Sequence, residues 1–135
     1  MTDNRVPRVV VADDETHVRT LMRSLLRKMA YDVVGEASDG KKAVEVFRDK
    51  RPDILLLDVN MPFQNGIDTL CQIKKEFPEA MVIMLTSVAD RESVEKAISM
   101  GAVNYIRKDT SVKDIGSLIT ETWQTFVEGL SHDNR

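Results

Sequence analysis

One stretch of the sequence, residues 54–66, constrains the fold more than any other. It reads ILLLDVNMPFQNG, so four consecutive aliphatic residues end on an acid, Asp58. A short apolar run bounded by turn residues predicts a strand that is buried on both faces. Pro62 and the pair Asn65-Gly66 prevent this strand from continuing and do not favour a helix directly after it. Asp58 is therefore expected at the end of a buried strand, in the crevice where open α/β sheets bind their ligands.

The same alternation of a short apolar run and a helical pattern occurs five times along the chain. Strands that alternate with helices predict right-handed crossovers and a parallel sheet covered by helices on both faces. Apolar residues at helical spacing follow each strand, and the last helix carries them from Val112 to Leu130. The strands are expected at residues 8–12, 32–37, 54–58, 80–85 and 102–106. Asp14 and Thr16 are candidate N-caps of the first helix, and Asp90 can cap the fourth.

Length and composition indicate one globular domain with a proper core. The chain has 135 residues, of which 42% are hydrophobic, and we expect a single domain at 1–130 with a polar tail at 131–135. A net charge of −3 and the lack of a basic tract argue against direct binding of nucleic acid. The N-terminus has no signal-peptide core and no apolar run approaches about 20 residues, so we expect a cytoplasmic protein without membrane insertion.

Polar residues that can bind a metal or take part in a reaction lie at the predicted strand ends, which share one edge of a parallel sheet. Close carboxylates raise one another's pKa unless a cation neutralises them, and oxygen ligands without His or Cys suit Mg²⁺. A carboxylate in such a group can act as a nucleophile and form an aspartyl-phosphate, while cations and hydroxyls neutralise the phosphoryl oxygens. The residues concerned are Asp13, Asp14, Asp58, Asn60, Thr86 and Lys108.

These motifs resemble those of response-regulator receiver domains, the CheY-like phosphoacceptors of two-component signalling. The resemblance extends over about residues 8–128 and implies a flavodoxin-like, doubly wound sheet of five parallel strands in the order 2-1-3-4-5. The motifs that carry it are Asp13-Asp14, DVNMP at 58–62, NG at 65–66, TS at 86–87, GA at 101–102 and YIRK at 105–108.

The resemblance implies how such a switch would work. Asp58 would accept a phosphoryl group from a histidine kinase, and Thr86 and Lys108 would contact that group. Tyr105 would turn inward as Thr86 moves, and the face of the fourth helix, fifth strand and fifth helix would then bind a downstream protein partner. Tyr105 could equally be a half-buried strand residue that never switches.

The resemblance also implies a magnesium site and no turnover of external substrates. Asp14 and Asp58 would bind Mg²⁺ through their side chains, Asn60 through its backbone carbonyl, and Asp13 mostly through water. The protein would assist its own phosphorylation and dephosphorylation, so we do not expect an enzyme in the ordinary sense. The apolar Val88 cannot orient a water molecule, and we expect no unusually fast loss of the phosphoryl group.

The sequence departs from the family pattern after Lys108. Most receivers have a proline with a cis peptide bond there, whereas this chain has Asp109. Because a cis bond before a non-proline residue costs about 3–4 kcal/mol, we predict a trans bond. The segment Lys-Asp-Thr-Ser is similar to that of NarL/LuxR-type receivers, which carry a C-terminal DNA-binding domain.

Several functions remain open at this point. The chain can be a stand-alone switch, the isolated receiver of a DNA-binding transcriptional regulator, or a phosphorelay intermediate, and a phosphorylation-dependent dimer is left open. A phosphatase or mutase is disfavoured, because Asn60 replaces the general acid that such enzymes need two residues after the nucleophile. A flavin-binding role is disfavoured too, because the acidic residues 13–15 would repel a phosphate.

Overall fold

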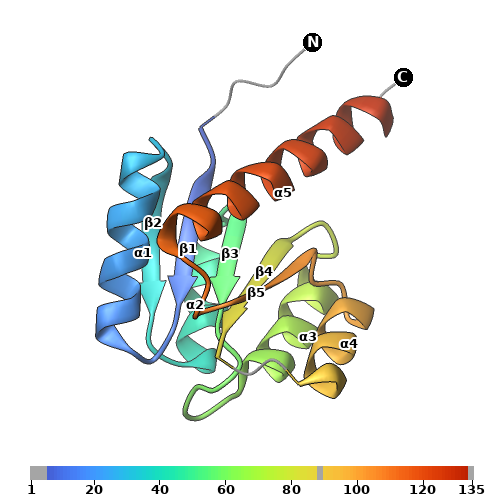
Figure 1. The fold of residues 1–135 in the computed structure, drawn as a ribbon. Coiled ribbons are helices and arrows are strands. Elements are labelled where there is room, and N and C mark those ends of the chain that lie inside the picture. Colours follow the sequence, from blue (N-terminus) through green and yellow to red (C-terminus); the bar gives the residue numbers. More distant parts are fainter. Residues whose placement is uncertain (1–5, 88–89, 134–135) are drawn as a thin grey trace.

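The computed structural model describes residues 6–87 and 90–133, which alternate between strands and helices throughout (Figure 1). The strands are β1 (Arg8–Ala12), β2 (Asp32–Ala37), β3 (Ile54–Leu57), β4 (Met81–Thr86) and β5 (Asn104–Arg107). The helices are α1 (Thr16–Lys28), α2 (Gly40–Lys50), α3 (Gly66–Glu76), α4 (Arg91–Ser99) and α5 (Val112–Asp133).

The five strands form one sheet in the order β2-β1-β3-β4-β5, and every neighbouring pair is parallel. This confirms the predicted fold class and strand order. The chain passes from β1 to β2 at one side and then returns to place β3 on the other side of β1. The direction of winding therefore reverses between β1 and β3, and α/β sheets of this type bind ligands at that point, beyond the carboxyl ends of the strands.

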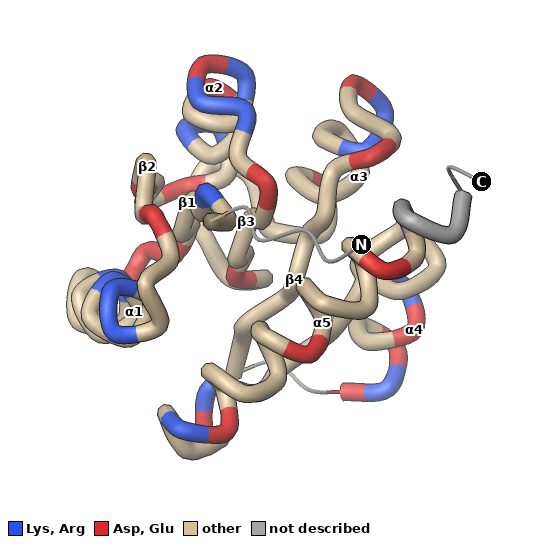
Figure 2. Tube along the Cα trace, turned by 90° about the horizontal axis from the view of Figure 1, so that it is seen from above, with Lys and Arg blue, Asp and Glu red and all other residues tan. Residues whose placement is uncertain are grey.

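Helices cover both faces of the sheet, as the alternation of side chains along each strand requires. Val9, Val11 and Leu56 face the core under α1 and α5, whereas Val10 and Leu55 face the core under α2, α3 and α4. Seen along the strands, α1 and α5 lie on one side of the sheet, and α2 and α3 lie on the other (Figure 2). All residues of β3 and β4 are buried, as expected for the central strands.

Side-chain caps explain where most of the helices begin. Asp39, Asn65 and Asp90 each accept a hydrogen bond from the backbone N–H three residues later, and the Asp90 cap was predicted. The prediction of Asp14 or Thr16 as the cap of α1 is wrong. The N-cap is Glu15, whose own side chain makes no capping bond.

Helix α5 continues to Asp133 and so extends into the segment that was expected to be a polar tail, because no proline interrupts it there. The Lys108–Asp109 bond is trans, as predicted, like every other peptide bond among the described residues. Val88 lies outside the described residues. None of the described helices is long and apolar enough to cross a membrane.

Candidate functional site

The carboxyl ends of β1, β3 and β5 bring three charged side chains from distant parts of the sequence together. Lys108 Nζ lies 2.8 Å from Asp13 Oδ2 and 3.1 Å from Asp58 Oδ2. The register of the sheet produces this arrangement, because Ala12 pairs with Leu57 and the next residue of each strand is the aspartate. The predicted convergence of these side chains is therefore present in the structure.

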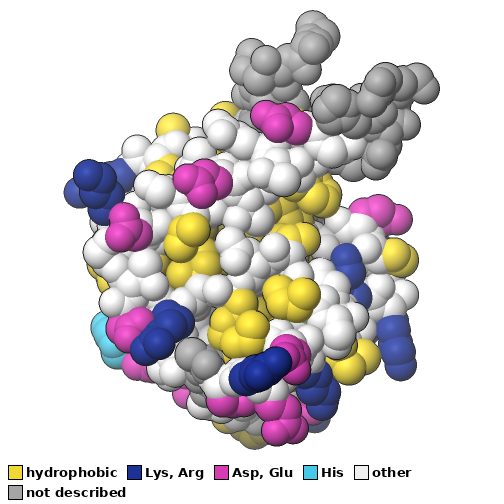
Figure 3. All heavy atoms as spheres, turned by 45° about the vertical axis from the view of Figure 1, so that its right-hand side comes forward, with side chains coloured by type: hydrophobic (Ala, Val, Ile, Leu, Met, Phe, Trp, Pro, Cys, Tyr) yellow, Lys and Arg dark blue, Asp and Glu magenta, His cyan; other side chains and the backbone are white. Residues whose placement is uncertain are grey.

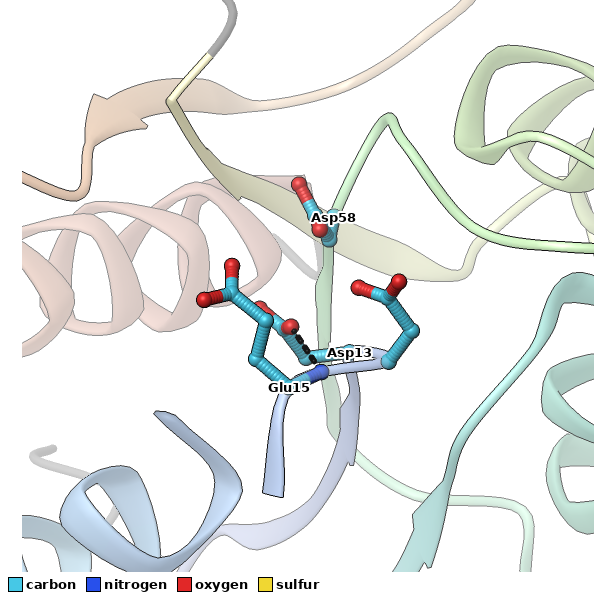
Figure 4. A group of neighbouring side chains, drawn as sticks. Asp13, Glu15 and Asp58 are labelled. Atoms are coloured by element: carbon cyan, nitrogen blue, oxygen red, sulfur yellow. Dashed lines mark hydrogen bonds between the residues drawn. The ribbon is translucent and has the colours of Figure 1, made fainter. Parts of the chain in front are cut away.

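A fourth charged residue, Glu15, completes the cluster. Its Oε1 lies 2.9 Å from Lys108 Nζ, so the ammonium group contacts three carboxylates at once. Figure 4 shows the carboxylates of Asp13, Glu15 and Asp58 turned toward the space between the ends of β1 and β3. We refer to Asp13, Asp14, Glu15, Asp58 and Lys108 as the acidic pocket.

The two aspartates that contact Lys108 are nearly inaccessible to solvent, with exposed fractions of 2% for Asp13 and 3% for Asp58. Asp13 Oδ1 accepts a hydrogen bond from the backbone N–H of Glu15 at 2.9 Å, which fixes the turn before α1. Asp58 Oδ1, in contrast, is buried and has no hydrogen-bond partner among the described residues. A buried charged oxygen without a partner is costly, so this atom favours a ligand that is positively charged or electrophilic.

Burial and ion pairing act against each other on the protonation of Asp13 and Lys108. Burial raises the pKa of Asp13, aided by the charge of Asp58, and the hydrogen bond from Lys108 offsets only part of that rise. Burial alone would lower the pKa of Lys108. Its hydrogen bonds to Asp13 and Glu15 and the charges of Asp13 and Asp58 outweigh this effect and raise the pKa above its ordinary value. Lys108 therefore stays positively charged at neutral pH.

The donor set of the acidic pocket fits a hard divalent cation. One carboxylate oxygen from each of the four acids lies within 4.8 Å of those of the others, and a single ammonium group faces them. Oxygen ligands without nitrogen or sulfur are the set that Mg²⁺ prefers. The unpartnered oxygen of Asp58 adds an independent reason for a cation here, because exposed acids such as Asp14 and Glu15 often lie close together without binding an ion.

Glu15 was not among the predicted site residues. In the sequence it stood out only as part of an acidic segment that would repel phosphate. The signal that could have identified it is its position directly after Asp13-Asp14, where the start of α1 turns its side chain back toward the end of β5.

The other predicted site residues, Thr86, Tyr105 and Asn60, lie around the acidic pocket in different environments. Thr86 is fully buried at the end of β4, and its carbonyl accepts a hydrogen bond from Lys108 N at 3.0 Å. Tyr105 is half-buried in β5 and packs against the core under α3 and α4. Burial and the charges of Asp90 and Asp58 raise the pKa of its hydroxyl. Asn60 is exposed in the β3–α3 loop.

Comparison with known proteins decides the family. Residues 9–120 match the model of the response regulator receiver domain. The chain belongs to this family. Receiver domains are signalling switches of two-component systems rather than classical enzymes, and Mg²⁺ binding at an acidic pocket and phosphoaspartate formation are general features of the family.

Individual relatives include a chemotaxis protein and transcriptional regulators. The chain is 39% identical over 114 residues to the transcriptional regulatory protein PdtaR of Mycobacterium tuberculosis, covering 84% of this chain and 55% of PdtaR. It is 37% identical over 101 residues to the chemotaxis protein CheY of Thermotoga maritima, covering 75% and 84%. The chain thus spans about half the length of PdtaR but most of CheY.

A solved structure supports the predicted similarity to LuxR-type receivers. A two-component response regulator of the LuxR family from Aurantimonas sp. SI85-9A1 superposes with a TM-score of 0.81 at 28% identity, covering 87% of this chain and 84% of the other.

Proposed function

We propose that this receiver domain is a phosphorylation-activated switch that accepts a phosphoryl group on Asp58 from a histidine kinase. The observation that carries the proposal is Asp58 Oδ1, a buried carboxylate oxygen without a hydrogen-bond partner among the described residues. In the transfer, a carboxylate oxygen of Asp58 forms a bond to phosphorus. The bond between phosphorus and the donor imidazole nitrogen breaks, and its electron pair stays on that nitrogen.

The residues around Asp58 have separate roles in this proposal. Lys108, already 3.1 Å from Asp58 Oδ2, would neutralise charge on the phosphoryl oxygens. Thr86, at the end of the neighbouring strand, would donate its hydroxyl to one of those oxygens. These contacts replace the water that would otherwise stabilise the transferred group.

We assign the magnesium site to residues that follow the carboxyl ends of β1 and β3. Asp14 and Asp58 would hold Mg²⁺ through their side chains and Asn60 through its carbonyl oxygen, and Asp13 would contact water bound to the ion. When bound, the ion neutralises negative charge that accumulates on the phosphoryl oxygens and on the carboxylates. Glu15 adds a further carboxylate within 4.8 Å of the others and holds Lys108 at the pocket.

The signal would leave the domain through the α4–β5–α5 face, which we define by Ile98, Val103, Tyr105, Val112 and Phe126. Hydrophobic side chains gather on this side of the molecule (Figure 3), and Ile98 is 47% exposed and Val103 42%. A surface cavity of about 340 Å³ lies between Val103 and Phe126. An exposed apolar surface of this kind suits a downstream protein partner rather than nucleic acid or lipid.

Tyr105 links the pocket to this face in our proposal. It lies in β5 three residues before Lys108 and pairs with Met84 in β4. Burial and the charge of Asp90 raise the pKa of its hydroxyl most, and the charge of Asp58 adds to this rise. A phosphoryl group adds negative charge and three acceptor oxygens at the strand ends, which would draw Thr86 and Lys108 toward it. The space released beside Thr86 would allow the Tyr105 ring to turn inward and change the face.

A second candidate is the receiver portion of a DNA-binding transcriptional regulator that acts in the cytoplasm. The relation to PdtaR, of which the chain covers 55%, and to a LuxR-family regulator favours it. In that case the α4–β5–α5 face would contact another domain or another subunit of the regulator. A role as phosphorelay intermediate shares the same acceptor chemistry, but no contact among the described residues favours it over the other two.

Phosphorylation by acetyl phosphate with Mg²⁺ tests the proposal. The wild-type protein and Asp58→Asn are incubated with this small donor, and the phosphoryl group is located by mass spectrometry of the intact and digested chain. Asp68→Asn is the matched control, because Asp68 is an exposed acid that follows the same loop. Modification of the wild type and of the control but not of Asp58→Asn is expected. Equal modification of Asp58→Asn, or none of the wild type, would refute the acceptor role.

A further inference from the structure

The β3–α3 loop exposes a large aromatic side chain close to the acceptor. Phe63 is 82% exposed, the highest value among the exposed large hydrophobic side chains of the described residues. Its φ angle is +67°, a region that L-residues other than Gly, Asn and Asp seldom occupy. Gln64 N donates to Pro62 O at 2.7 Å, so Phe63 is the central residue of a γ-turn with positive φ, which is rare and strained.

The base of this loop is held firmly against the strand that carries the acceptor. Gly66 N donates to Val59 O at 2.7 Å, which closes the loop directly after Asp58. A Cβ atom at Gly66 would lie 1.9 Å from the carbonyl oxygen of Asp58, so only glycine allows this approach. The orientation of the loop is therefore fixed relative to Asp58.

The tip of the loop is held as well. The Gln64 side chain donates to Gln72 Oε1 on α3 at 3.0 Å, and the Gln64 carbonyl approaches Gly40 so closely that a Cβ atom there would lie 2.0 Å away. These contacts fix Gln64, which directly follows Phe63, so the exposure of Phe63 follows from the packing of the loop. A strained backbone conformation that the surrounding contacts hold in place is often found at functional sites.

We propose that Phe63 is a docking residue for the protein that donates the phosphoryl group to Asp58, with its ring entering an apolar recess beside the donor histidine. The proposal rests on the proposed function, since it requires Asp58 to be the acceptor. It concerns a contact outside the acidic pocket and does not involve the metal site.

Geometry favours the donor protein as the partner of this ring. The donor imidazole must come within bonding distance of Asp58, and a specific protein contact covers about 600–800 Å² of each partner, a disc of roughly 14–16 Å radius. Phe63 lies three positions before Gly66, so their Cα atoms are at most about 11 Å apart. Because Gly66 touches the Asp58 backbone, Phe63 lies within the area that any donor protein must cover.

The position of Phe63 also separates it from the other apolar surface. The α4–β5–α5 face lies at the edge of the sheet that β5 forms, whereas Phe63 follows β3, the central strand. A ring at the mouth of the acceptor site would be covered during transfer and free again afterwards. An aromatic side chain in such a place adds contact area at little cost in conformational entropy, as interface anchors do.

The test compares a protein donor with a small donor. The histidine kinases of the source organism are purified and autophosphorylated with ATP, and the kinase that phosphorylates the wild-type chain fastest serves as the protein donor. Acetyl phosphate with Mg²⁺ serves as the small donor. The variants are Phe63→Asn, which removes the ring but tolerates positive φ, and Phe63→Tyr, which keeps the ring.

A selective effect is expected. Phe63→Asn should lower kcat/KM for the kinase by about 10- to 100-fold, whereas its rate with acetyl phosphate stays within about twofold of wild type. Phe63→Tyr should retain most of the rate with both donors. Thermal unfolding of the variants reports on strain in the loop. Phe63→Asn should be at least as stable as wild type, because Asn tolerates positive φ better than Phe does.

Other outcomes overturn the inference. Unchanged kinase kinetics for Phe63→Asn, an equal loss with both donors, or no kinase that phosphorylates a chain modified by acetyl phosphate would each exclude a donor contact. A change in the sedimentation of the unphosphorylated protein on mutation would instead identify a second copy of the chain as the partner. Failure of both donors to modify Asp58 in the wild type would be a failure of the proposed function itself.

Discussion

The acidic pocket and the α4–β5–α5 face are built on opposite physical principles. In the pocket, Asp13 and Asp58 are 2% and 3% exposed, and three of the four clustered carboxylates contact one ammonium group. On the face, Ile98 and Val103 leave nearly half of their surface in water, and no described contact buries them. The pocket thus has an excess of buried negative charge, and the face has an excess of exposed apolar area.

This difference indicates what each region can bind. An excess of buried charge is relieved by cations and by chemistry at an oxygen atom, and it changes when a single small group is added. Exposed apolar area is relieved by a macromolecular surface that covers it. The two regions are connected through the paired strands β4 and β5, where Thr86 lies beside Arg107 and its carbonyl binds Lys108 N.

The largest loss of stability is expected when the positively charged Lys108 side chain is removed from the acidic pocket. Lys108→Met leaves two buried carboxylates without their shared partner, so the free energy of unfolding at pH 7 should fall by about 2–3 kcal/mol. Lys113→Met, at an exposed position of α5, is the control and should change it by less than about 0.5 kcal/mol. Urea denaturation measures both values, and a loss no greater than that of the control would show that the ion pairs do not stabilise the pocket.

The pH dependence of the Lys108 effect follows from the directions of the pKa shifts. The folded-state pKa of Lys108 is raised, so its stabilisation is fully present below its ordinary value of 10.5 and is lost as the pH rises further. At the acidic end, the raised pKa of Asp13 means that this carboxylate takes up a proton above its ordinary value of 3.8. The difference between wild type and Lys108→Met should therefore be largest near neutral pH and shrink toward both extremes.

A divalent cation should produce the next largest effect, with the opposite sign. At a free concentration ten times its dissociation constant, Mg²⁺ should raise the free energy of unfolding by about 1.4 kcal/mol. Asp14→Asn should remove most of this gain, whereas Asp109→Asn should keep it, because Asp109 is exposed and pairs with Arg107. Thermal melts with Mg²⁺ and with EDTA measure the effect, and equal gains in both variants would place the ion elsewhere.

A smaller effect is expected from the residue that the sequence did not identify. Glu15→Gln should lower the free energy of unfolding by no more than roughly 0.5 kcal/mol, since the Glu15 side chain is 44% exposed and water screens its ion pair. The hydrogen bond from Lys108 lowers the pKa of Glu15, so the stabilisation is present above its ordinary value of 4.5 and is lost as the pH falls.

The control for Glu15→Gln is Glu128→Gln, an exposed acid on α5. Denaturation at pH 7 and at pH 3 separates the two variants, because only the Glu15 effect should depend on Lys108. A difference that persists at pH 3 would mean that Glu15 acts through packing or helix formation instead of through its charge.

The smallest effect is expected on the α4–β5–α5 face. Ile98→Ser removes exposed apolar area from α4 but touches none of the pocket residues, so the free energy of unfolding should change by less than about 0.5 kcal/mol. The stabilisation by Mg²⁺ should be the same as in wild type. The same thermal melts measure this. A lost or halved stabilisation by Mg²⁺ in this variant would show that the face and the pocket are energetically coupled in the unphosphorylated protein.

Much of this architecture could be predicted because it depends on local pattern. Apolar runs such as residues 54–57 form the strands, and residues such as Asp90 begin a helix where they were expected to. The start of α1 was predicted less well, because the side chain of Asp13 binds the N–H of Glu15 and takes the place of the expected cap. Competition of this kind between side chains depends on their directions in space.

The sequence by itself determined the order of strands and helices, the residues at the strand ends and the family to which the chain belongs. These properties follow from the spacing of apolar residues and from short motifs, which are local and therefore visible along the chain. Only the tertiary structure decided that Lys108 contacts Glu15 as well as Asp13 and Asp58, that one oxygen of Asp58 has no partner among the described residues, and that Phe63 is exposed in a strained turn. Burial and contact distance depend on segments that are far apart in the sequence, so they exist only once the sheet has brought those segments together.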